Sequence, residues 1–138
     1  MTSRPLLSTQ PISPAERLIL ALDVPSPAIA RELVEMLGDT VCFYKIGLEL
    51  FMAGGYFELI EWLRARGKKV FVDLKFFDVP ETVRSAVRQL QPYGATFTTV
   101  HGNDAILRAA VAAAQETGGD LGILAVTALT SLDQADLT

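Results

Sequence analysis

The residues best placed to do chemistry are four charged side chains, Lys45, Asp73, Lys75 and Asp78. Asp73 and Lys75 follow the apolar run 70–72, and side chains two residues apart on a β-strand share one face. The spacing Asp-x-Lys-x-x-Asp therefore predicts a lysine held between two carboxylates, which favour its charged form. Lys45 ends an earlier apolar run and would extend this alternation of charge. Such an array could stabilise negative charge that develops on a bound substrate.

These charges could also form only ordinary ion pairs at the surface. Charged residues make up 20% of the chain, and Asp and Lys at strand ends often pair without any further role. The hydrophobic neighbours of the charges are Phe71, Val72, Leu74, Phe76 and Phe77. Removing charge from water among apolar side chains is costly, and this cost favours a functional site.

Polar side chains follow each of five apolar runs that resemble β-strands. The runs span 18–22, 41–44, 70–72, 95–100 and 121–126, and they lead into Asp23, Lys45, Asp73, His101 and Thr127. Between the runs lie helix signals: prolines in first turns, glycines after last turns and apolar residues spaced by three and four. Two such apolar stripes are Ile29, Leu33, Met36 and Leu37, and Tyr56, Leu59, Ile60 and Leu63. Four helices are expected, around 27–37, 56–66, 80–90 and 104–117.

The polar strand ends are 22, 28, 28 and 26 residues apart, which indicates a repeating βα unit. Such repeats build parallel sheets, because each helix must carry the chain back over the sheet. An open doubly wound sheet and a closed barrel both fit. The first turn, 23–27, has no glycine-rich phosphate loop, which argues against dinucleotide binding. Polar groups at the C-terminal ends of successive strands favour an α/β fold of the (β/α)8 TIM-barrel type.

The expected units do not complete a barrel. Five strands and four helices correspond to about (βα)4β5, whereas a whole barrel needs roughly 200 residues or more. Strands one and five would otherwise be apolar exposed edges, which soluble proteins avoid. We therefore expect a fragment, with a leader over residues 1–17 and the N-terminal portion of a barrel domain over residues 18–138.

Composition narrows the classes of function. The net charge of −4 argues against a nucleic-acid surface. No apolar run reaches the roughly 18 residues of a membrane span. Residues 1–14 lack the apolar region of a signal peptide, and the single cysteine, Cys42, excludes an internal disulfide. These features predict a cytoplasmic protein with no metal cluster and no nucleotide loop.

The segment Asp73–Pro80, Asp-Leu-Lys-Phe-Phe-Asp-Val-Pro, resembles the signature of orotidine 5'-phosphate decarboxylases, Asp-x-Lys-x-x-Asp-Ile-Pro. Val79 stands where isoleucine is usual. Four further segments resemble other strand motifs of this family: Leu20–Asp23, Tyr44–Phe51, Thr99–His101 and Ala125–Ser131. Five motifs in order, at βα spacing, are far more specific than any one of them.

The resemblance implies a role for each matching residue. Lys75 would protonate C6 of the pyrimidine after CO2 leaves, with Asp73 and Asp78 as its catalytic partners and without cofactor or metal. Further substrate contacts would come from Asp23, Lys45, Val79, Thr82 and Thr130. Asp78 and Thr82 would cross a homodimer interface into the partner's site. His101 and Thr127 match strand-end positions to which no chemistry is assigned.

The implied activity is decarboxylation of orotidine 5'-phosphate to UMP, the last step of de novo pyrimidine synthesis. The resemblance places the phosphate-binding groups in later strands, outside these 138 residues, so the chain alone is not expected to decarboxylate the substrate at a meaningful rate. Two alternatives stay open: an inactive barrel fragment, and a Mg2+-dependent hexulose- or ketogulonate-phosphate enzyme of the same superfamily. The latter group resembles this chain on strand three but carries an acidic residue where Lys45 stands, and a lysine there would repel the metal.

Overall fold

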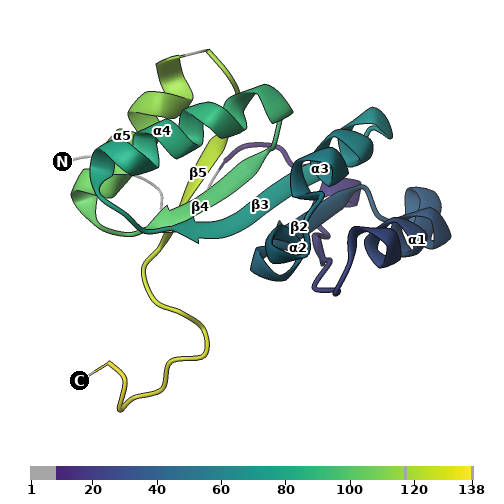
Figure 1. The fold of residues 1–138 in the computed structure, drawn as a ribbon, viewed down its shortest axis with the longest axis horizontal. Coiled ribbons are helices and arrows are strands. Elements are labelled where there is room, and N and C mark those ends of the chain that lie inside the picture. The colour runs from purple at the N-terminus through teal and green to yellow at the C-terminus, as the bar shows by residue number, and fades with distance from the viewer. Residues whose placement is uncertain (1–8, 117, 138) are drawn as a thin grey trace.

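Strands and helices alternate along the chain in the computed structural model, which describes residues 9–116 and 118–137 (Figure 1). The strands are β1 (Leu20–Ala21), β2 (Phe43–Gly47), β3 (Lys69–Phe76), β4 (Phe97–His101) and β5 (Gly122–Val126). The α-helices are α1 (Pro27–Leu37), α2 (Leu48–Ala53), α3 (Tyr56–Ala65), α4 (Pro80–Leu90) and α5 (Asp104–Glu116). Three 3-10 helices are η1 (Pro14–Glu16), η2 (Gly38–Thr40) and η3 (Gln91–Tyr93).

All five strands form one parallel sheet in the order β1-β2-β3-β4-β5. A doubly wound sheet reverses its strand order at a switch point, whereas a barrel keeps the order of the sequence. The sequential order confirms the predicted α/β fold of the barrel type. Within the described ranges the sheet is open, because β1 and β5 each pair with one neighbour only.

The helices lie against one face of the sheet (Figure 1). Crossovers of one hand place successive helices on the same side. Alternate strand residues point into this helix layer and are fully buried: Tyr44, Ile46, Val70, Val72 and Val100. They meet buried helix residues that include Val34, Leu59, Leu63, Val83, Val87 and Ala110. This contact forms the core of the described structure.

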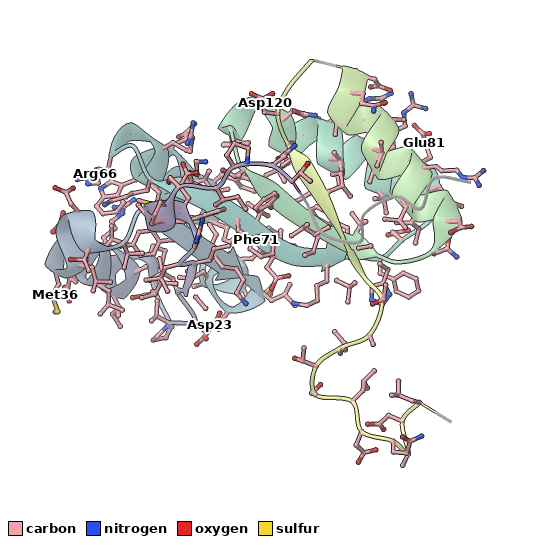
Figure 2. The ribbon with its side chains drawn as sticks, turned by 180° about the vertical axis from the view of Figure 1, so that it is seen from behind. Asp23, Met36, Arg66, Phe71, Glu81 and Asp120 are labelled. Atoms are coloured by element: carbon pink, nitrogen blue, oxygen red, sulfur yellow. The ribbon has the colours of Figure 1, made fainter. Side chains whose placement is uncertain are left out.

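The opposite face of the sheet carries an aromatic layer. Figure 2 labels Phe71 near the centre of the sheet, on β3. Its ring centroid lies 6.0 Å from that of Phe97, which in turn lies 5.9 Å from that of Phe43. Gly122 completes the layer, because a Cβ atom there would come within 2.6 Å of the Phe97 ring. In a barrel this face is the interior, so the rings pack beneath the charged strand ends.

Two predictions about the first βα unit were wrong. β1 contains two residues instead of 18–22, and Leu18 and Ile19 are 56% and 38% exposed at this edge of the sheet. In α1 the buried residues are Ala30 and Val34, whereas the predicted stripe of Ile29, Leu33, Met36 and Leu37 is exposed or half-buried. An edge strand and its helix have fewer neighbours to cover them, so hydrophobicity predicts their burial poorly.

The second and third strands extend further than predicted. β2 continues past Lys45 to Gly47 and leads directly into α2, a helix that the sequence did not predict. β3 continues past Asp73 to Phe76. A helix as short as α2 has no repeating apolar stripe, and it depends on the tertiary burial of Leu50.

The described part of the expected leader contacts the N-terminal ends of the strands. Glu16 forms an ion pair with Lys69 at the start of β3, with 2.7 Å between the charged atoms. The Cys42 thiol donates to the carbonyl of Ala15 across 3.0 Å. Residues 1–8 of this leader lie outside the described residues. No helix in the ranges that the structure describes is long and apolar enough to cross a membrane.

Candidate active site

Asp73 and Lys75 meet at the C-terminal end of β3. The Lys75 ammonium lies 2.9 Å and 3.0 Å from the two carboxylate oxygens of Asp73. The strand is not regular at this point. Between the paired positions Val72 and Phe76, β3 contains two more residues than β4, and Lys75 has a φ of 47°. The two side chains therefore come together as the spacing predicted, but through a local irregularity and not through simple alternation along a strand.

Lys45 reaches the same carboxylate from β2. Its ammonium lies 3.2 Å from Asp73 Oδ2. The backbone of Lys45 pairs with that of Phe71, which lies two residues before Asp73 on the same face of β3. The long side chain of Lys45 therefore extends along the strand direction to reach the Asp73 carboxylate. Two lysines from neighbouring strands thus contact one aspartate, and the predicted alternation Lys45, Asp73, Lys75 is present.

Asp73 receives a further hydrogen bond from β4. The hydroxyl of Thr99 donates to Asp73 Oδ1 across 2.8 Å, and it accepts a hydrogen bond of 2.9 Å from the backbone N–H of Lys75. Thr99 is buried at 6% exposure. Three adjacent strands therefore converge on one carboxylate, whose side chain is 9% exposed.

The surroundings of Asp73 act on its pKa in opposite directions. Burial taken alone would raise the pKa, because it penalises the charged form. The hydrogen bonds from Lys75, Thr99 and Lys45, together with the charge of Lys75, outweigh burial and hold the pKa below its ordinary value. Tyr56, whose hydroxyl donates to the carbonyl of Ile46, has a raised pKa because of burial and the negative charge of Asp73. Asp73 is thus a fixed anion at neutral pH.

An open cavity of about 560 Å³ lies above these charges. Its wall from β3 and β4 includes Phe71, Asp73, Lys75 and Thr99. The remaining wall comes from Lys45 and from residues 125–131, which are the last two residues of β5 and the segment that follows it. Thr130, predicted as a substrate contact, and Thr127, the strand-end residue without assigned chemistry, both line this cavity. The volume is suited to a small organic ligand.

Asp78 lies apart from this cluster. Its carboxylate accepts a hydrogen bond of 2.7 Å from the backbone N–H of Val79, the residue before α4. In the part of the chain that the structure describes, no ion pair joins Asp78 to Lys75. The prediction of a lysine held between two carboxylates is therefore wrong within one chain. The cause is the irregular turn at Lys75, which directs its ammonium back to Asp73, while Asp78, Val79 and Thr82 remain exposed.

Asp23 and His101 also lie outside the cluster. Asp23, labelled in Figure 2, is exposed after β1, an edge strand of the sheet. The ring of His101 stacks on that of Phe77, with 4.3 Å between the ring centroids and an angle of 28° between the planes. Neither side chain has a hydrogen bond to Asp73 within the described residues.

A sequence profile described as "Orotidine 5'-phosphate decarboxylase / HUMPS family" matches residues 16–138. The chain belongs to this family. A curated relative from Methylococcus capsulatus, named orotidine 5'-phosphate decarboxylase, is 63% identical over 131 residues, which cover 95% of this chain and 52% of the relative. A relative of the same name from Bradyrhizobium sp. is 53% identical over 91% of this chain and 51% of its own length.

Two solved structures agree with the fold. The crystal structure of orotidine 5'-phosphate decarboxylase from Lactobacillus acidophilus superposes with a TM-score of 0.76 at 36% identity, over 87% of this chain and 56% of that protein. An uncharacterized conserved protein from Geobacillus kaustophilus gives a TM-score of 0.76 at 34% identity. The chain spans about half the length of the curated relatives it matches.

Two parts of this family member's site were not singled out from sequence. Thr99 was noted only as part of a strand motif, although it lies two residues before His101, a spacing that places it on the same strand face. Gly47 pairs with Asp73, and a Cβ atom there would lie 3.3 Å from the Asp73 carbonyl oxygen. Threonine and glycine are common in strands and turns, so their types alone carried no signal.

Proposed function

We propose that the protein containing this chain decarboxylates orotidine 5'-phosphate to UMP, as a carboxy-lyase. The observation that carries the proposal is the array of Lys45, Asp73 and Lys75 at the ends of two adjacent parallel strands, beside a cavity. Its support is membership of the family and the names of relatives that are 63% and 53% identical. Because the chain spans about half of those relatives, the activity belongs to the whole protein.

In the proposed reaction, the bond between C6 of the pyrimidine and its carboxylate breaks, and CO2 leaves. The electron pair stays on C6, where the Lys75 ammonium stabilises it and then transfers a proton to it. An N–H bond breaks, a C–H bond forms, and solvent returns a proton to the lysine. A cation about 4 Å from the developing charge contributes on the order of 4 kcal/mol at an effective dielectric of about 20, or about three decades in rate. This chemistry uses side chains and needs no cofactor.

Asp73 has two functions in this proposal. It holds the Lys75 ammonium through two oxygens, so that the proton donor is in place before substrate binds. Its fixed negative charge also faces the position of the substrate carboxylate, which disfavours the bound ground state relative to the neutral CO2 that leaves. The remaining acceleration must come from remote binding energy, above all from the phosphate.

The other predicted contacts are assigned to the ribose and pyrimidine. Lys45 and Asp23 would contact the ribose, and Thr130 would lie at the pyrimidine edge. Lys45 and Thr130 line the cavity, which supports these assignments, whereas Asp23 is exposed and does not line it. We expect the phosphate-binding groups in the half of the relatives that this chain does not span.

We further propose a cytoplasmic homodimer in which Asp78, Val79 and Thr82 contact the partner's substrate. The support is their exposure at the rim of the strand ends, where Phe77 and Val79 are 70% and 63% exposed. Exposed apolar residues beside a site favour an interface. The net charge of −4 does not favour nucleic acid as a partner. The described residues contain no membrane-spanning helix, so they do not favour a membrane as a partner.

Lys45 discriminates between this activity and that of the hexulose- and ketogulonate-phosphate enzymes. Those enzymes would need an anionic Mg2+ ligand at the end of β2. Here an ammonium lies 3.2 Å from Asp73, so it competes with a cation for the same carboxylate. The structure therefore offers no observation that favours the Mg2+-dependent activity.

The test is a decarboxylation assay on the natural protein, after a mass measurement that establishes its length. Loss of orotidine 5'-phosphate is followed by absorbance and UMP is identified by mass spectrometry, with and without EDTA. We expect UMP and CO2 in equal amounts, at a rate that EDTA does not change. Activity restored by Mg2+ on a ketose phosphate would favour the rival enzyme. The absence of turnover in the natural protein would favour the inactive fragment.

A further inference from the structure

Thr99 on β4 connects the two principal residues of the site through one oxygen atom. Its hydroxyl donates to Asp73 Oδ1 across 2.8 Å and accepts from the Lys75 N–H across 2.9 Å. A hydroxyl has one hydrogen, so the donation to Asp73 leaves its lone pairs for the Lys75 amide. The side chain is β-branched and 6% exposed, which restricts its rotation. The two contacts are therefore made together and from a fixed position.

The Lys75 backbone needs such a partner. Its φ of 47° lies in the left-handed region, which a residue with a side chain adopts only where its surroundings enforce it. Between Val72 and Phe76, β3 leaves the regular pairing with β4, so the strand ladder does not supply an acceptor for every N–H. The Thr99 hydroxyl supplies the acceptor for Lys75. Without it, a half-buried N–H would have no partner, which is unfavourable.

We propose that Thr99 is a positioning residue that holds the Lys75 backbone in its left-handed conformation and orients the Asp73 carboxylate toward the lysine. This inference rests on the proposed function for its effect on catalysis, but its structural content is independent of any substrate. The left-handed conformation turns the Lys75 ammonium back to Asp73, and the same hydroxyl fixes the oxygen that receives it. A single change at Thr99 should therefore loosen both the proton donor and the anion.

The neighbouring Thr98 provides a matched control. It is fully buried on the same strand, and its hydroxyl donates to the carbonyl of Val72 across 3.0 Å, on the helix side of the sheet. Thr98→Val and Thr99→Val each replace a buried hydroxyl by a methyl group of equal size. Both variants lose stability, but only Thr99→Val should alter the site. Thr99→Ser keeps the hydroxyl but loses the β-branch, and it should lie closer to the wild type than to Thr99→Val.

The experiment measures two properties of the natural protein without substrate. Hydrogen exchange measures how fast the Lys75 amide exchanges with solvent. Carbon NMR follows the titration of the Asp73 carboxylate. The groups that face this carboxylate are Lys45 from β2, Lys75 from β3, Thr99 from β4 and Tyr56 from α3. In Thr99→Val we expect the Lys75 amide to exchange roughly tenfold faster. The Asp73 pKa should move up, since one of its donors is lost. Thr98→Val should leave both properties unchanged.

Kinetics then test the catalytic consequence. Thr99→Val should lower kcat roughly ten- to hundredfold with little change in KM, because misplaced groups affect the transition state more than binding. The acid limb of the pH profile of kcat should move to higher pH in Thr99→Val, and Thr99→Ser should restore most of the rate and of the profile.

Wild-type exchange and titration in Thr99→Val, or equal changes in Thr98→Val, would overturn the proposal. If Thr99→Val does not fold, Thr99→Cys, with a weak donor and acceptor, should give intermediate values, and wild-type values there would count against it. If the structural changes appear but the wild type produces no UMP, the proposed function fails while the positioning role stands.

Discussion

The two ends of β3 each carry an ion pair between a lysine and a carboxylate, and the two pairs differ in the surroundings of the carboxylate. Lys69 pairs with Glu16 at the start of the strand, and Lys75 pairs with Asp73 at its end. Both lysine side chains are 38% exposed, but Glu16 is 34% exposed whereas Asp73 is 9% exposed. Only Asp73 is also bound by a second lysine and a threonine.

This comparison shows that the surroundings of the anion, and not those of the lysine, separate an ordinary pair from a site. An exposed carboxylate with one partner is screened by water and contributes little. A buried carboxylate with four hydrogen bonds is a fixed charge that can hold a cation in one place. Catalysis that depends on preorganised charge requires the second arrangement.

The largest expected difference between the two ends is in activity. Lys75→Ala should reduce kcat by about three decades or more, because it removes the cation and the proton donor. Lys69→Ala removes the other lysine of the same strand and should keep kcat within about twofold, since its pair contributes modestly to stability alone. Steady-state rates of UMP formation measure both variants. Equal losses in the two would mean that the ion pair at the end of β3 has no special role.

A hybrid dimer tests whether the site at the end of β3 is completed by a second chain. Lys75→Ala and Asp78→Ala subunits, each inactive alone, should recover roughly a quarter of wild-type activity when mixed, because half of the dimers carry one intact site of two. Different affinity tags allow the hybrids to be isolated and counted. Lys75→Ala mixed with itself is the control. Hybrids that form without any recovery would show that each site is built within one chain.

Acid should remove the contribution of the Asp73 carboxylate to the stability of the fold. Because the folded-state pKa of Asp73 lies below its ordinary value of 3.8, its ionisation stabilises the fold above that value. This contribution is lost as the pH falls through the lower, folded-state pKa. At neutral pH, Asp73→Asn should lower the free energy of unfolding by about 1–3 kcal/mol, since two ammonium groups lose their anion. Urea titrations across the acid range should show that the free energy of unfolding of Asp73→Asn depends less on pH than that of the wild type.

The smallest effect is expected at Glu16. Glu16→Gln should change the free energy of unfolding by less than about 1 kcal/mol, because its partly exposed pair with Lys69 is screened by water. Added salt should remove most of this difference, whereas it should affect the variants at Asp73 less. Denaturation at low and high ionic strength measures both. A loss at Glu16 as large as that at Asp73 would contradict the distinction drawn from their exposure.

Much of the fold followed from local patterns. The 22- to 28-residue spacing of polar strand ends reflects the length of a strand and the helix that returns over it, and so it predicted the parallel sheet. The buried stripe of α3, which consists of Tyr56, Leu59, Ile60 and Leu63, was predicted in full because its period is intrinsic to a helix. β1 and α1 were predicted less well, since their burial depends on how many neighbours surround them.

The sequence by itself determined which charges stand at the strand ends, and that Lys45, Asp73 and Lys75 occupy neighbouring strands of one sheet. Tertiary structure decided which of the predicted partners meet. The left-handed turn at Lys75 sets its ammonium against Asp73 and not against Asp78, and it arises from the local mismatch between β3 and β4. Thr99 acquires its role from the strand beside it. Spacing along a chain orders side chains on one strand, but hydrogen bonds between strands depend on register, which no single segment encodes.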